Sequence, residues 1–321
     1  MGQAKVLVAA SSKARARALR KSMEFLDRGV DAFVGDVEPT DWRGYRLAVF
    51  ELGRKLPTLD GKLDKLSLKA HVAVSPPRLD VRTVVHYMQD PRVNHLLLRP
   101  LDIGDLQLIA DKLGSGSIFG LERHLPPQCE VVYRRLSTFA ERCDAIDDLE
   151  AYARKRRLRS LIRRNAVRVA EELLMNAMYQ APVDSQGERI FANVDPHARV
   201  SQRTPRPVSI RYAVHDRHLY LSVRDRFGSF RRDDLVRYLT RCVTEQVQIE
   251  EKKLGAGLGL YLIASTVNRM VINLLPGSVS EFICTFEPPQ AGEPSGMRLF
   301  SFTAHRPRPA PPLEPALEPG W

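Results

Sequence analysis

The sequence has few cysteines, no long apolar run and no excess of acidic charge. Four cysteines are scattered through 321 residues without a C-x-x-C pair, which argues against a disulfide-stapled scaffold and a zinc knuckle. No apolar stretch approaches the ~20 residues that a membrane-spanning helix needs. The apolar N-terminal run, residues 6–8, is too short for the core of a secretory signal. We therefore expect a cytoplasmic protein with no membrane span.

Positive charge is in excess, with 49 Lys and Arg against 38 Asp and Glu and a net charge of +11. Most of the arginines are dispersed, and the densest cluster covers residues 154–164 of a predicted helix. The cluster itself contains no aromatic side chain to stack on a nucleic-acid base. A solvated helix face, or a docking surface for an acidic protein, explains the cluster better than nucleic-acid binding. A DNA-associated regulator remains a less favoured alternative.

Residues 5–113 alternate short apolar runs with helical patterns. The predicted strands cover 5–9, 47–50, 71–74 and 95–98, and the predicted helices cover 12–26, 80–89 and 102–113. Short buried strands separated by helices are typical of a parallel, doubly wound α/β sheet of the flavodoxin-like kind.

The second part of the chain has a different order of elements. Residues 128–180 have a mostly helical pattern, and the polar stretch 184–206 is predicted to be a loop. The predicted strands cover 208–214, 219–223, 270–275, 281–287 and 298–303, with helices at 233–243 and 258–268. Consecutive strands with grouped helices predict an α/β sandwich, in which helices cover one face of an antiparallel or mixed sheet.

These patterns divide the chain into four segments. We predict a first domain over residues 1–120, a helical linker over 121–160 and a second domain over 161–304. Residues 305–321 are Pro-rich and are predicted to be a disordered tail.

Three motifs contain side chains that could bind a ligand or take part in catalysis. The first is a pair of polar residues on a predicted helix. Glu172 and Asn176 are four residues apart, so a helix places them on the same face beside an apolar stripe. A carboxylate and an amide in this arrangement could polarise a water and complete the oxygen shell of Mg²⁺. Without further support, the same pair could simply belong to a solvated helix face.

The second motif is Asp225, which ends a predicted strand and enters a turn containing Gly228. A carboxylate at the edge of a sheet can accept a hydrogen bond from an exocyclic amine such as that of adenine. The alternative is an aspartate that only starts the turn.

The third motif is a glycine-rich loop before a predicted helix. Gly255, Gly257 and Gly259 alternate, and Leu260 begins the apolar run that follows. Glycines allow backbone N–H groups to approach an anion, and the N-terminus of a helix favours phosphate. The spacing fits neither a Walker loop nor a Rossmann fingerprint, and a purely structural loop is the alternative.

Taken in order, these motifs resemble the nucleotide-binding domain of the GHKL (Bergerat-fold) ATPases, which include gyrase, MutL, histidine kinases and anti-sigma-factor serine kinases. The resemblance covers about residues 150–290. It implies that Asn176 binds magnesium, that Glu172 activates the attacking water or hydroxyl, and that Asp225 contacts adenine.

The same resemblance implies a Bergerat-type fold for the second domain, with ATP and Mg²⁺ as cofactors. Gly228 would belong to the turn that contacts adenine, and the glycine-rich loop with Leu260 would bind the phosphates. Lys253, in the segment that would close over ATP, would also be available to the phosphates. The sequence departs from the family pattern at the two glycine positions after Asp225, which are Phe227 and Ser229.

The first domain resembles a response-regulator receiver domain in the order of its strands, but it lacks the receiver's chemistry. Residues 9–12 are Ala-Ala-Ser-Ser where a receiver has an acidic pair, and the strand at 47–50 is followed by Glu51 in place of the phosphoacceptor aspartate. Arg99 replaces the usual lysine, and Ser75 keeps the hydroxyl position. Without clustered carboxylates a divalent cation has no site here, which predicts a pseudo-receiver that serves as an interaction surface.

The resemblances together predict an ATP-binding signal-transduction protein with a histidine-kinase-like ATPase domain that transfers phosphate to, or regulates, a partner protein. An autophosphorylating histidine kinase is disfavoured, because His124 lacks an acidic neighbour and precedes two prolines. The arrangement is closer to an ATP-dependent serine kinase or an ATPase. The alternative is a non-enzymatic, nucleotide-responsive or pseudo-kinase regulator, and the 128–165 helices could pair two chains into a homodimer.

Overall fold

The computed structural model describes residues 5–10, 12–24, 30–34, 41–52, 59, 61–194, 203–244, 258–288 and 296–304. Three predicted site residues, Lys253, Gly255 and Gly257, lie outside the described residues, as does the predicted tail at 305–321. Among the described helices, none is long and apolar enough to cross a membrane. Cys129, Cys143 and Cys284 carry free thiols.

The first half is a parallel sheet with helices on both faces. Its strands are β1 (Lys5–Ala10), β2 (Val30–Val34), β3 (Tyr45–Glu51), β4 (His71–Ser75) and β5 (Val93–Leu96), in the order β2-β1-β3-β4-β5. Its helices are α1 (Lys13–Glu24), α2 (Val81–Met88) and α3 (Ile103–Ser115), with a short 3₁₀ turn at Leu63–Lys65. This strand order is that of a flavodoxin-like doubly wound sheet, which confirms the predicted fold class.

The predicted helix starts in this half are set by side-chain caps. Asp80 accepts a hydrogen bond from the backbone N–H of Thr83 at 2.8 Å, and Asp102 accepts one from Gly104 at 2.6 Å. Each carboxylate satisfies an N–H group that the helix itself leaves without a partner.

The second half is a mixed sheet covered by helices. Its strands are β6 (Val132–Leu136), β7 (Val208–His215), β8 (His218–Asp225), β9 (Arg269–Leu275), β10 (Val279–Phe286) and β11 (Arg298–Thr303). Its helices are α4 (Phe139–Lys155), α5 (Ser160–Met175), α6 (Arg232–Thr244) and α7 (Leu258–Thr266), with a 3₁₀ turn at Leu121–His124. The order is β11-β9-β10-β8-β7-β6, in which only β11 and β9 are parallel. The predicted mixed sheet with helices is thus confirmed.

Residues 128–180 are mostly helical, as predicted, but the strand β6 at their start was not predicted. β6 pairs with β7 along its whole length, from Val132 opposite Tyr212 to Leu136 opposite Val208. Three successive side chains at 133–135 are exposed, as befits the edge strand of a sheet. The apolar alternation that marks a half-buried strand is therefore missing from its sequence. The segment 121–160, predicted to be a helical linker, contains this strand as well as α4.

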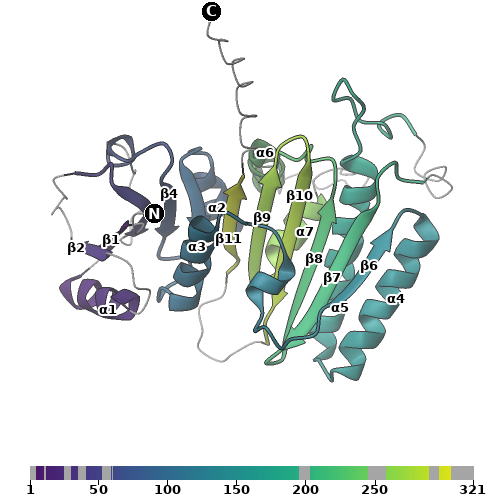
Figure 1. Ribbon diagram of the computed structural model, residues 1–321, viewed down its shortest axis with the longest axis horizontal. Helices are drawn as coiled ribbons and strands as arrows, with labels where there is room; N and C mark the ends of the chain where they lie inside the picture. Colours follow the sequence, from purple (N-terminus) through teal and green to yellow (C-terminus); the bar gives the residue numbers. More distant parts are fainter. Residues whose placement is uncertain are drawn as a thin grey trace, which may run out of the picture.

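In the described ranges, the two halves share one continuous sheet of 11 strands. The last strand, β11, joins them by pairing antiparallel with β5 at Leu299 and Leu96, and parallel with β9 on its other side. Figure 1 shows the yellow β11 between the blue elements of the first half and β9. The C-terminal strand of the described chain therefore lies at the centre of the molecule.

Buried polar contacts strengthen this junction. Lys112 of α3 donates to the side-chain oxygen of Asn273 on β9 at 3.2 Å. Asp105 of α3 forms an ion pair with Arg269 of β9 at 2.7 Å, and Glu281 of β10 accepts the backbone N–H of Gly120 at 2.9 Å. Because these groups are buried, each would be costly to leave without a partner. We infer that the halves are held as one structural unit.

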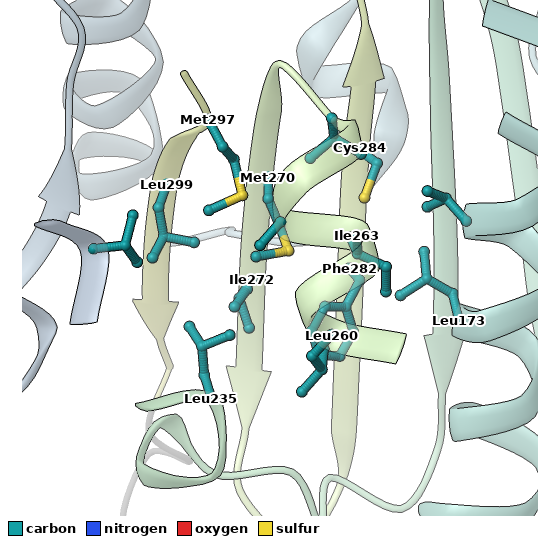
Figure 2. Packing of buried hydrophobic residues seen from close by; sticks show 14 of the residues in the cluster. Leu173, Leu235, Leu260, Ile263, Met270, Ile272, Phe282, Cys284, Met297 and Leu299 are labelled. Atoms are coloured by element: carbon teal, nitrogen blue, oxygen red, sulfur yellow. The ribbon is translucent and has the colours of Figure 1, made fainter. Parts of the chain in front are cut away.

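The hydrophobic core lies on both faces of the sheet. One cluster lies under α2, α4, α5, α6 and α7, and the other lies under α1, α3 and the segment around Leu121. Figure 2 shows the first cluster where Leu235 of α6, with Leu260 and Ile263 of α7, covers Ile272 and Phe282 of the sheet. This packing fixes α6 and α7 over the strands, and the candidate site lies beside it.

Candidate functional site

A cavity of about 490 Å³ opens between α5, α6, the start of α7 and the end of β8. Five predicted site residues, Glu172, Asn176, Asp225, Gly259 and Leu260, line it. They come from three motifs that are far apart in the sequence, so only the tertiary fold brings them together. The cavity falls within the range of about 300–1,000 Å³ that is usual for small-molecule sites.

Glu172 lies in the last turn of α5, and Asn176 follows the helix directly, one turn further along, as the spacing predicted. Val169 and Leu173 on the same helix are buried against the sheet, which turns the intervening polar positions toward the cavity. At Asn176 the α-helix gives way to a π-helical turn, Asn176–Gln180, in which the Asn176 carbonyl accepts the N–H of Ala181 at 2.8 Å. Single π turns are rare and are frequent at functional sites.

The carboxylate of Glu172 lies against the first turn of α7. A Cβ atom at Gly259 would lie only 2.2 Å from Oε2 of Glu172, so this close approach needs glycine. Burial of Glu172 and, to a smaller extent, the neighbouring charge of Glu171 raise the pKa of the Glu172 carboxyl. A carboxylate beside free N–H groups is also favoured by the helix dipole. The arrangement holds the Glu172 carboxyl, with its raised pKa, beside Gly259 in the first turn of α7.

Asp225 is buried at the end of β8 and shapes the turn that follows. Its Oδ1 accepts the backbone N–H groups of Phe227 at 2.8 Å and Gly228 at 3.0 Å. Burial raises the pKa of the Asp225 carboxyl, and these two N–H groups act in the opposite direction. The aspartate therefore both starts the turn and lines the cavity, so the two interpretations of this motif are compatible.

Gly228 does not line the cavity itself but makes the turn possible. It has φ +60°, and a Cβ atom there would lie 2.3 Å from the backbone nitrogen of Ser278. The two positions where the sequence departs from the family pattern have defined places. Phe227 is buried, and Ser229 lines the cavity while its hydroxyl donates to the carbonyl of Ala181 at 2.8 Å.

The floor and rim of the cavity contain residues that the sequence analysis did not identify. Phe230 and Phe282 line it and meet edge to face with ring centroids 4.9 Å apart. At the rim, Arg189 donates to the side-chain oxygen of Gln180 at 3.0 Å and to the hydroxyl of Tyr238 at 3.5 Å. Nothing in the local sequence marks these residues, because their positions depend on contacts between separate segments.

The donor set suits a magnesium ion that arrives with a ligand better than a metal held by protein alone. Across the described ranges, no group of three or more His, Cys, Asp or Glu side chains could hold a metal ion. Glu172 and Asn176 offer oxygen donors to the cavity. Mg²⁺ usually takes one or two protein oxygens and completes its shell with waters and phosphates, so these residues fit that role.

An ion-pair cluster lies at the carboxyl end of β3 in the first half. Glu51 at the end of β3 is buried and pairs with Arg15 of α1 at 2.6 Å, with Nε of Arg99 at 3.9 Å. Arg99 also donates to the carbonyl of Ser75 at 3.3 Å. Two arginines neutralise the Glu51 carboxylate, which leaves little negative charge there to attract a divalent cation.

Comparisons with known proteins leave the family open. No protein-family model matches the chain, and no curated protein matches it. A response regulator protein from Burkholderia multivorans is 16% identical, and the alignment covers 35% of this chain and 96% of that one with a TM-score of 0.27. A response regulator receiver domain protein from Clostridium thermocellum is 15% identical, with 34% and 93% covered and a TM-score of 0.25. Both are described as response regulators, and neither as a GHKL protein.

Proposed function

We propose that the protein binds ATP with Mg²⁺ in the cavity beside α5 and α7 and acts in signal transduction, transferring phosphate to a partner protein or regulating one. The observation that carries this proposal is the convergence of Glu172, Asn176, Asp225 and Gly259 on one cavity. These are the residues for which the sequence motifs imply roles in nucleotide binding.

The chemistry of the lining supports a purine base at one end. Phe230 and Phe282 offer aromatic surface for a flat ring. Asp225 lies beside them as a buried acceptor for an exocyclic amine. Hydrogen bonds to charged groups contribute about 1.5–3 kcal/mol, which is enough to select a base that carries the amine.

The other end of the cavity suits the phosphates. The first turn of α7 presents N–H groups with the favourable end of a helix dipole, and Gly259 allows close approach. Asn176 would supply an oxygen to Mg²⁺, which neutralises phosphate charge when it is bound. Glu172, whose pKa is raised by burial, would orient or deprotonate the attacking hydroxyl or water.

The second candidate is a non-enzymatic regulator that binds nucleotide without turnover. The buried Phe227, at a position where the family has glycine, favours this alternative because it alters the turn that Asp225 starts. Both candidates use the same cavity and differ only in the chemical step.

Turnover and binding measured on the full chain separate the two. ATP binding and ATP turnover are compared for the wild type, Asn176→Ala and Glu172→Gln, with Arg164→Ala on the exposed part of α5 as a charge control. Loss of turnover in both site variants, with turnover preserved in the control, supports the enzyme. ATP binding with equal, negligible turnover in all variants supports the regulator, and a wild type that binds no ATP contradicts both.

A further inference from the structure

The rim of the cavity includes a short hairpin over residues 183–189. Val183 and Arg189 form an antiparallel bridge at its base. Asp184 holds the loop, since its Oδ1 accepts the N–H groups of Gln186 at 2.8 Å and Glu188 at 2.9 Å. Such internal hydrogen bonds fix the direction in which the last residue, Arg189, leaves the hairpin.

The guanidinium of Arg189 extends from this hairpin to α6. It donates to neutral oxygens only, to Oε1 of Gln180 at 3.0 Å and to the hydroxyl of Tyr238 at 3.5 Å. Within the described part of the chain, no carboxylate pairs with it. Arg237, also in the lining, differs in that it forms an ion pair with Asp234 at 2.6 Å.

Arg189 is therefore a positioned positive charge with one good hydrogen bond, to Gln180, and one weak contact, to Tyr238. A guanidinium has five N–H donors in a planar fork, and that fork matches two oxygens of a phosphate. A contact of 3.5 Å is at the limit of a hydrogen bond, so exchanging Tyr238 for a phosphate oxygen costs little. A bidentate, charge-assisted contact would be about twice as strong as a neutral one.

We propose that Arg189 binds the terminal phosphate of a nucleoside triphosphate in this cavity, leaving Tyr238 when it does so, and thereby distinguishes triphosphate from diphosphate. This proposal rests on the proposed function, because it assigns a phosphate contact within the same cavity. It adds a segment, the 183–189 hairpin, that none of the three sequence motifs includes.

The test measures the affinities of the full chain for ATP, ADP and AMP by isothermal titration calorimetry in the presence of MgCl₂. We expect Arg189→Ala to weaken ATP binding by about 10-fold to 100-fold, the range for a lost charged hydrogen bond, with little change for ADP or AMP. Arg189→Lys keeps the charge without the fork and should give an intermediate loss. Arg164→Ala, which removes an equal charge from α5 outside the cavity, should leave all three affinities at wild-type values.

A second variant tests whether Arg189 acts only through its contact with Tyr238. Tyr238→Phe removes the hydroxyl that Arg189 contacts but keeps the ring, and we expect ATP affinity to stay the same or to rise a few-fold. A tenfold loss in Tyr238→Phe would overturn the proposal, because Arg189 would then act only through that contact. Equal losses for ATP and ADP in Arg189→Ala, or no loss at all, would also overturn it while leaving the proposed function intact. A wild type that binds no nucleotide would overturn both.

Discussion

Replacing Gly259 by alanine tests whether the position of the Glu172 carboxylate matters for activity. The added Cβ atom would lie 2.2 Å from Oε2 of Glu172, well inside van der Waals contact. The obstructing atom is the end of a flexible side chain, so the carboxylate can rotate away without a shift of the backbone. We therefore expect Gly259→Ala to fold and to displace Glu172 from the first turn of α7.

The expected effects on stability and on activity differ greatly in size. Alanine in place of a helical glycine stabilises by about 0.5–1 kcal/mol. Moving Glu172 to a poorer rotamer costs about 0.5–1.5 kcal/mol. The two contributions oppose each other, so the free energy of unfolding should stay within about 1 kcal/mol of the wild type. If Glu172 acts as the acid–base group, ATP turnover should fall by about 10²-fold to 10⁴-fold.

Urea denaturation and steady-state ATP turnover measure the two quantities on the same preparation. Gly104→Ala is a matched control, because Gly104 also lies in the first turn of a helix and its added Cβ would be 3.0 Å from a carboxylate oxygen of Asp102. That variant should keep wild-type turnover. Wild-type turnover in Gly259→Ala, with an unchanged free energy of unfolding, would refute a catalytic role for the observed position of Glu172.

Three further predictions concern residues around the cavity. Burial raises the pKa of the Asp225 carboxyl, so the folded state binds its proton more tightly than the unfolded state does, and the protein loses stability as the pH rises from the unfolded-state pKa through the folded-state pKa. Asp225→Asn should therefore melt at a higher temperature than the wild type at pH 7, and this gain should fade at acid pH. Its nucleotide affinity should fall. Arg232→Ala removes hydrogen bonds from the α6 guanidinium to the carbonyls of Met88 at 2.9 Å and Asp90 at 2.7 Å, so it should cost about 2–3 kcal/mol by denaturation and speed amide exchange in α6. Gly228→Ala places a Cβ against backbone at positive φ and should lower stability by at least about 2 kcal/mol, and a stability like that of the wild type would contradict the described turn.

The elements that the sequence predicted well have strong local signals. The helices α2 and α3 begin where the sequence predicts them, directly after Asp80 and Asp102. Each aspartate caps its helix, and a capping carboxylate acts within a few residues of its own position. The strand β11 begins and ends at the predicted residues, Arg298 and Thr303. The motif residues Glu172 and Asn176 share a helix face because a period of 3.6 residues is a local property.

The features that the sequence did not reveal depend on contacts between distant segments. The pairing of β11 with β5 joins residues about two hundred positions apart, and no local pattern encodes such a register. The sequence does not predict the edge strand β6, because three successive exposed side chains replace the alternation of apolar and polar residues that marks a half-buried strand. Arg189 lies in a polar stretch with no distinctive pattern, and only the fold places it opposite Tyr238.

Calorimetric titration of the full chain with ATP in MgCl₂, for the wild type and Asp225→Asn, tests the central claim most directly. If the cavity is a purine-triphosphate site, the wild type binds one ATP per chain, and Asp225→Asn binds it at least about tenfold more weakly, as expected for a lost charged hydrogen bond. Absence of heat with the wild type, or equal ATP affinity in the two proteins, would contradict the account.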